Sequence, residues 1–185
     1  PLPGQKRGPD FLSPEWSQKV AFARRYCDTL GLGCDFTFGT LWPFGGTFLP
    51  EEDASQRFDG PSPQRLGRSW ELPLEGRILN HLDRQAFLRY ADRVGAALAE
   101  ALAPAEESEH SIPLSLYPSV PLRSGLFCDS FEVETEGLWT GGFDKAFTER
   151  FGYDVREYMP KLDDYSDVRY DYRKLISQYA LDEFY

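Results

Sequence analysis

Apolar residues recur every three or four positions in four segments of the chain, which is the spacing that places them on one face of a helix. The first segment starts at Ser13 and Pro14, an N-cap and a first-turn proline, and it ends before Gly31. The other segments run over 83–103, 143–151 and 167–185. Gly152 follows the segment 143–151 directly, in the place of a helix C-cap. The pattern therefore predicts four helices.

Two short apolar runs lie between these helices and have the length of strands. Residues 32–38 form the first run, which ends in a loop rich in glycine, proline and aromatic residues over 39–46. Residues 126–128 form the second run, which changes abruptly into the sequence Asp129-Ser130-Phe131-Glu132. Helix, strand and loop alternate along the chain, and this order predicts an α/β fold.

Residues 51–73 interrupt this alternation. The segment is polar and contains Pro61, Pro63 and Pro73, and proline suits neither a helix interior nor a central strand. We expect the segment to be a polar excursion from a single domain that spans residues 1–185, and not a part of its core.

The charge of the chain bears on the partners that it is expected to have. Its 30 acidic and 20 basic side chains give a formal net charge of −10. An acidic chain repels phosphate backbones and anionic lipid surfaces, so we expect neither nucleic acid nor a membrane as a partner. No apolar stretch approaches the ~20 residues of a membrane span, and no signal peptide is recognisable. The cellular compartment stays open.

Two carboxylates, Asp129 and Glu132, follow the second predicted strand directly. In α/β barrels the catalytic groups lie at the carboxyl ends of the strands, where the loops open to solvent. Acids in this position, followed by a loop that contains Trp139, are what a carbohydrate-cleaving site needs. The alternative is that Asp129 caps the next segment and that Glu132 is merely exposed, because this short string is common by itself.

The loop after the first predicted strand contains Trp42, Phe44, Gly45 and Gly46. Glycines let the backbone approach a ligand closely, and the face of a Trp ring stacks on the apolar face of a sugar. The alternative is a tight turn whose aromatic rings belong to the core, which is where such rings usually lie. The two histidines of the chain have no neighbours arranged like a catalytic triad, so we assign them no catalytic role.

These segments together resemble glycoside hydrolase family 106, the α-L-rhamnosidases and their relatives. The resemblance rests on LGLGCDFTFGTLWPFGG, then LFCDSFEVETEGLWTGGFDKAFTERFGYDVREYMPKL, then VRYDYRKLISQYALDEFY, and it is clearest over 13–46 and 125–185. In that family a GWPFGG-like loop and a DSxE block recur within a (β/α)₈ catalytic domain. The chain departs from the family pattern at Thr40-Leu41, where Ser-Gly is expected, and at Met159, where Leu is usual.

The resemblance implies an inverting hydrolysis of terminal α-L-rhamnosidic bonds, with calcium helping to hold the sugar. Glu132 would then be the general acid, Asp129 would orient it or contact the substrate, and Trp42 and Trp139 would line the sugar subsite. An inverting enzyme also needs a general base, with the two carboxyl groups ~6.5–9.5 Å apart. The family's base is expected on a later strand than those of this chain. The calcium ligands are left open.

The length of the chain qualifies these expectations. A closed TIM-type barrel usually has about 250 residues and at least roughly 200, whereas this chain has 185 and begins at Pro1. We therefore expect an incomplete barrel, a part of such a catalytic domain. The alternatives are a non-catalytic carbohydrate-binding relative, an inactive fragment of the enzyme, or a different glycosidase that shares only the barrel and the glutamate at a strand end.

Overall fold

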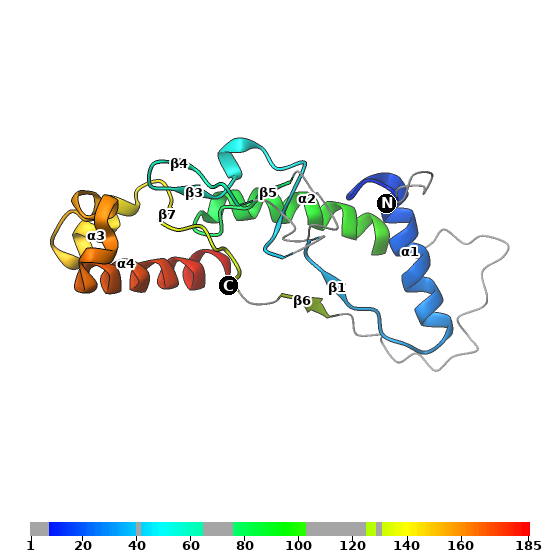
Figure 1. Ribbon diagram of the computed structural model, residues 1–185. Helices are drawn as coiled ribbons and strands as arrows, with labels where there is room; N and C mark the ends of the chain where they lie inside the picture. The colour runs from blue at the N-terminus through cyan, green and yellow to red at the C-terminus, as the bar shows by residue number, and fades with distance from the viewer. Residues whose placement is uncertain (1–7, 40–41, 65–75, 103–124, 129–130) are drawn as a thin grey trace. The chain divides into compact units, whose positions relative to one another are not determined.

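The computed structural model describes residues 8–39, 42–64, 76–102, 125–128 and 131–185, and its fold is mixed α/β. The chain divides into two compact units (Figure 1). Unit 1 comprises Pro1–Phe38 and Ala91–Cys128, and unit 2 comprises Gly39–Tyr90 and Asp129–Tyr185. The division falls within helix α2 (Arg84–Leu102). The single domain predicted over residues 1–185 stays a prediction.

In unit 1, helix α1 (Pro14–Thr29) begins and ends as predicted. The Ser13 hydroxyl accepts a hydrogen bond from the Trp16 N–H at 3.2 Å, which confirms the N-cap. The most deeply buried residue of α1 is Ser17, whose hydroxyl donates to the Ala97 carbonyl of α2 at 3.1 Å. Small side chains at this crossing let a hydroxyl reach a helix carbonyl, and an apolar pattern cannot predict such a contact.

The strands of unit 1 are shorter than predicted. Strand β1 (Phe36–Thr37) pairs in parallel with β6 (Leu126–Phe127), and Thr37 lies opposite Phe127. Leu126 and Phe127 are apolar, but more than half of the surface of each is exposed. Parallel pairing of strands that are far apart in the sequence is the arrangement that an α/β alternation predicts.

Unit 2 contains two small antiparallel sheets. Strand β2 (Gly45–Gly46) pairs with β5 (Arg77–Ile78). In the other sheet, β3 (Gln56–Arg57) lies between β4 (Gly60–Pro61) and β7 (Leu138–Trp139). Within the described ranges these sheets do not close into a barrel.

The described part of the segment 51–73, residues 51–64, differs from the predicted excursion. It contains η1 (Glu51–Asp53), β3 and β4, and its buried residues are Asp53, Ala54, Ser55 and Ser62. The carboxylate of Asp53 accepts hydrogen bonds from Arg89 Nε at 3.0 and 3.1 Å. Polar composition was misleading here, because a buried carboxylate is tolerated where a charged partner satisfies it.

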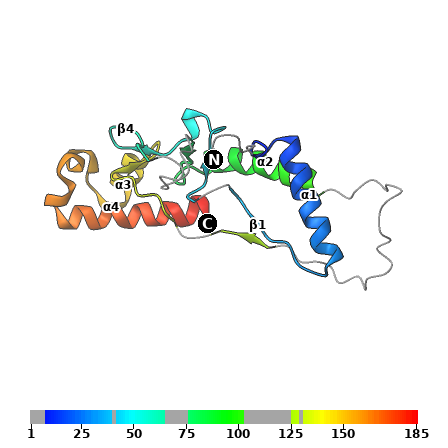
Figure 2. The ribbon, with the colours of Figure 1, turned by 45° about the vertical axis from the view of Figure 1, so that its right-hand side comes forward.

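The C-terminal part of unit 2 is helical. Helix α3 (Phe143–Phe151) has the predicted bounds, and Gly152 closes it in the left-handed conformation, with φ of 82°. After η3 (Val155–Glu157) and η4 (Met159–Asp164), helix α4 (Ser166–Tyr179) continues into the π-helical turn η5 (Ala180–Phe184). Figures 1 and 2 show α3 beside α4 from two directions. Their shared core consists of Phe143, Phe147, Val155, Val168, Tyr172 and Leu175.

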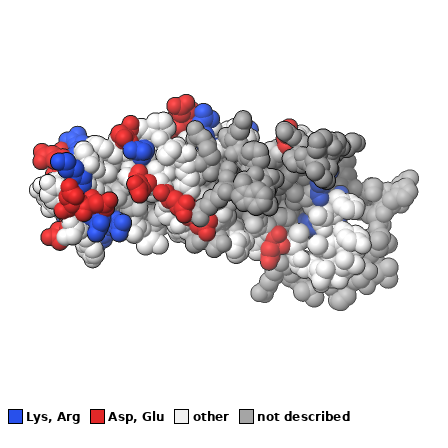
Figure 3. Space-filling model, viewed as in Figure 1, with Lys and Arg blue, Asp and Glu red and all other residues white. Residues whose placement is uncertain are grey.

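This helical core is joined to the sheet of β7. The Tyr172 hydroxyl donates to the Leu138 carbonyl at 2.7 Å, and the ring of Phe143 lies 4.9 Å from that of Trp139. Acidic and basic side chains are interspersed over the surface of α3 and α4 (Figure 3). The ion pair between Asp144 of α3 and Arg156 of η3, at 3.1 Å, is partly exposed and contributes little to stability.

Candidate functional site

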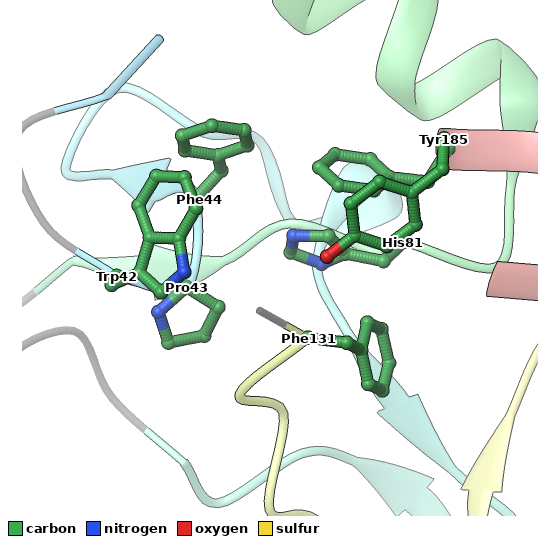
Figure 4. A pocket seen from close by; sticks show the side chains of 7 residues that line it. Trp42, Pro43, Phe44, His81, Phe131 and Tyr185 are labelled. Atoms are coloured by element: carbon green, nitrogen blue, oxygen red, sulfur yellow. The ribbon is translucent and has the colours of Figure 1, made fainter. Parts of the chain in front are cut away.

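A small pocket in unit 2 is lined almost entirely by aromatic rings (Figure 4). Its walls consist of Trp42, Pro43, Phe44, His81, Phe131, Phe184 and Tyr185. The volume of the pocket is about 10 Å³, roughly the room that one water molecule needs. The pocket can therefore take a single group of a ligand, such as one hydroxyl, and not a whole sugar ring.

The loop before β2 provides one wall of the pocket. The rings of Trp42 and Phe44 meet at 76° with their centroids 4.3 Å apart. Phe44 is only 2% exposed, and its ring also packs on Tyr90 at 6.0 Å. Phe44 therefore belongs both to the core and to the pocket lining, while Trp42 is half-buried.

Gly45 and Gly46 do not line the pocket, although they belong to the same predicted motif. A Cβ atom at Gly45 would lie 2.1 Å from the carbonyl oxygen of Arg77. The glycine is therefore required by the close approach of β2 to β5. In the structure, these two glycines form β2, which follows Phe44 directly, and the paired strand β5 leads to His81.

His81 is held at the centre of the pocket. Its side chain is buried, and its Nδ1 lies 2.7 Å from the carbonyl oxygen of Leu79. A carbonyl can only accept, so Nδ1 carries the proton of the neutral ring. Burial lowers the pKa of His81 to about 4. The ring is therefore neutral near pH 7, and Nε2 presents a lone pair.

The turn that carries His81 is fixed on both sides. The N–H of Asn80 donates to the Asp53 carbonyl at 2.8 Å, and the Asn80 side chain accepts from the Leu82 N–H at 3.1 Å. The Asn80 amide also donates to the Thr140 hydroxyl at 3.3 Å. These bonds fix the backbone at His81 and with it the direction of the ring.

Aromatic rings surround the imidazole of His81. Its centroid lies 4.5 Å from that of Phe184 and 5.6 Å from that of Phe131, and the Phe131 ring meets it at 89°. Figure 4 shows a nitrogen edge of the imidazole turned towards the middle of the pocket. Such a pocket suits a neutral ligand that has an apolar face and at least one hydrogen-bond donor.

Glu132 follows Phe131 directly and is half-buried, but it is not among the lining residues. The side chain of Gln64 holds the backbone around it. Its Nε2 donates to the Glu132 carbonyl at 3.2 Å, and its Oε1 accepts from the Glu134 N–H at 2.7 Å. Asp129 lies outside the described residues.

Trp139 lies apart from the pocket lining. Its ring packs against Phe58 at 5.0 Å and Phe143 at 4.9 Å, beside the core of α3 and α4. Of the predicted site residues, the structure thus brings Trp42 and Phe44 to one pocket, and Glu132 follows the lining residue Phe131 in the sequence.

Sequence reasoning missed His81, and it missed Phe131, Phe184 and Tyr185 as pocket residues. The only local signal at His81 is its position just before the Asp83 N-cap, whose carboxylate accepts from the Gln85 N–H at 2.8 Å. A cap signal does not reveal that rings from distant segments enclose the imidazole. That enclosure, and not a triad, makes the histidine notable.

The calcium implied by the resemblance finds no ready ligands in the described part of the chain. There, no group of three or more His, Cys, Asp or Glu side chains is arranged to hold a metal ion, whereas calcium takes six to eight oxygen ligands. The described residues therefore do not fit this ion, and calcium stays a prediction.

Across the same residues, no helix is both long and apolar enough to cross a membrane.

Comparisons with models of protein families, with curated protein sequences and with solved structures find no match to this chain.

Proposed function

We propose that this chain belongs to a glycoside hydrolase that cleaves terminal α-L-rhamnosidic bonds, and that the aromatic pocket is part of its sugar subsite. One observation carries the proposal. Trp42 and Phe131 come from two loops that were predicted to be functional, they line one pocket around a neutral His81, and Glu132 is the next residue after Phe131. An aromatic wall beside a carboxylate is a suitable setting for holding and cleaving a sugar.

The connectivity of the strands supports a place in a TIM-type barrel. Thr37 and Phe127 end two strands that are paired in parallel, in register. Trp42 and Glu132 each come five residues after these paired ends. Loops that follow the carboxyl ends of neighbouring parallel strands form the active face of such barrels. The complete barrel would need further strands beyond those described.

The proposed chemistry assigns separate roles to three side chains. The apolar face of the rhamnose ring stacks on Trp42, and Glu132 donates a proton to the departing glycosidic oxygen. Gln64 keeps the backbone of Glu132 in place through its hydrogen bond to the Glu132 carbonyl. The general base is a second carboxylate, ~6.5–9.5 Å from the first, that activates water on the opposite face of the sugar.

A second candidate function is carbohydrate binding without catalysis. One observation favours it: none of the seven residues that line the pocket has a carboxylate side chain. A binding relative would keep the aromatic subsite and release no rhamnose. The two candidates thus differ in turnover and agree on sugar affinity.

The hydrolysis of an aryl α-L-rhamnoside, measured by the release of the phenol, tests the proposal. We expect turnover in the wild type, and Glu132→Gln should lower kcat by a factor of about 10² or more, as removal of a general acid does. Glu136→Gln, an exposed glutamate of the same loop, is the matched control and should retain activity. Equal activity of the Glu132 variant and the control would overturn the role of Glu132. Binding of rhamnose without any turnover would favour the second candidate.

A further inference from the structure

The lone pair of His81 Nε2 has no hydrogen-bond partner among the described residues. The proton of the ring is committed to the Leu79 carbonyl through Nδ1, at 2.7 Å. No side-chain nitrogen or oxygen of the described chain is both sealed from solvent and unpaired. The Nε2 atom, on a ring that lines the pocket, is therefore open to that pocket.

The Nε2 acceptor, in these apolar surroundings, needs a hydrogen-bond donor as its partner. An acceptor that is open to the pocket pairs with water or with a ligand, because a polar atom left without a hydrogen bond in an apolar setting is costly. Phe44, Phe131 and Phe184 surround the imidazole and have no hydrogen-bond donors. The lining also includes the indole N–H of Trp42 and the hydroxyl of Tyr185, so the pocket combines the acceptor of His81 with walls that are mostly apolar. The bonds of Asn80 fix the turn that carries this acceptor.

We propose that His81 is the specificity residue of this pocket, and that its Nε2 accepts a hydrogen bond from one free hydroxyl of a bound neutral sugar. The apolar face of the same sugar packs against Trp42 and Phe131. This inference rests on the proposed function for the identity of the sugar. It does not depend on turnover, and it holds equally for a binding relative.

The chemistry of the lining separates a neutral ligand from a charged one. None of the lining residues has an acidic side chain that could compensate a bound cation, and none has a basic side chain for an anion, because His81 is neutral. An uncharged hydroxyl donor meets the lone pair with no charge to desolvate. A sugar that lacks this hydroxyl leaves the acceptor unpaired, and this is how such sites discriminate strongly.

Calorimetric titration with methyl α-L-rhamnoside and its three monodeoxy analogues tests the inference. In the wild type, we expect one analogue to bind at least about tenfold more weakly than the parent, equivalent to ~1.4 kcal/mol. His81→Phe keeps an aromatic ring and removes the acceptor. In this variant the affinity for methyl α-L-rhamnoside should fall by the same factor. The analogue that binds weakly to the wild type should then bind as tightly as methyl α-L-rhamnoside. Phe22→Leu, at an exposed position of α1 outside the pocket lining, is the control and should bind like the wild type.

A measurement on the wild type keeps the test valid if the variant fails to fold. The chain has two histidines, so nitrogen NMR of histidine-labelled protein, with His110→Gln for assignment, isolates the His81 signals. We expect the Nε2 resonance to shift upfield on saturation with methyl α-L-rhamnoside, while Nδ1 stays protonated. An unchanged Nε2 signal, or equal affinity of His81→Phe and wild type, overturns the inference, as does a failure of the wild type to bind the sugar. Hydrolysis with unchanged Nε2 would overturn this inference alone and leave the proposed function standing.

Discussion

The ring of Phe131 meets the ring of His81 edge to face, with the centroids 5.6 Å apart and the planes at 89°. This contact joins the loop of Glu132 to the turn that carries the buried histidine. Any sugar held beside His81 therefore lies against the residue that precedes the proposed general acid. In the proposed function, this contact places sugar binding and proton transfer on one short stretch of backbone.

Replacing Phe131 should disturb binding and catalysis together. Phe131→Leu removes the edge-to-face contact and one wall of the pocket, and aromatic pairs contribute about 0.5–1.5 kcal/mol beyond their buried area. We expect kcat/KM for the aryl rhamnoside to fall by a factor of about 10. Phe22→Leu, at an exposed position of α1, is the matched control. Wild-type kinetics in both variants would contradict the proposed place of Phe131.

The burial of His81 should make stability depend on pH. Its pKa is about 4 in the folded chain and about 6.5 when exposed, so between these values the unfolded chain binds the extra proton. The free energy of unfolding should therefore be highest above pH 6.5 and fall by up to about 3 kcal/mol as the pH approaches 4. Urea denaturation at a series of pH values measures this change. The difference in the free energy of unfolding between wild type and His81→Phe should follow the same pH dependence. A difference that stays constant with pH would contradict this role of His81.

A side chain at Gly45 should separate β2 from β5. The Cβ atom of Gly45→Ala would lie 2.1 Å from the Arg77 carbonyl oxygen, so the strands must move apart, at a cost of about 1–3 kcal/mol. Thermal denaturation should show the loss as a lower Tm. Gly141→Ala is the control, because no heavy atom lies within 4 Å of its Cβ position. Similar Tm values for the two variants would show that the close approach of the strands is absent.

Gln64 should affect the reaction only by holding the backbone of Glu132 in position. Gln64→Leu removes its bonds to the Glu132 carbonyl and the Glu134 N–H, and the loop loses its fixed geometry. We expect kcat to fall about tenfold with KM within about twofold, because Gln64 does not line the aromatic pocket. Gln18→Leu, an exposed glutamine of α1, should leave both constants unchanged. A rise in KM with unchanged kcat would mean that Gln64 contacts the substrate instead.

Local signals predicted the helices well. Ser13 and Gly152 each act through backbone groups within four residues, so the bounds of α1 and α3 could be read from the sequence. The start of α4 at Ser166 differs by one residue from the prediction. Such signals depend only on neighbours in the chain.

Contacts between distant segments could not be predicted in the same way. The prediction of a seven-residue strand over 32–38 rested on apolar residues, but only Phe36 and Thr37 pair with the distant β6. Asp53 lies in a polar stretch and is buried only because Arg89 satisfies it. His81 belongs to the pocket through Phe131 and Phe184, and no local pattern predicts those contacts.

The most direct test of the proposed function is the configuration of the first product. Proton NMR can follow an aryl α-L-rhamnoside incubated with the full chain and resolve the two anomers of free rhamnose before they equilibrate. An inverting hydrolase should release the β-anomer first, and the signal should be absent with Glu132→Gln. Release of the α-anomer first would contradict the inverting mechanism, and the absence of any released rhamnose would contradict the hydrolase.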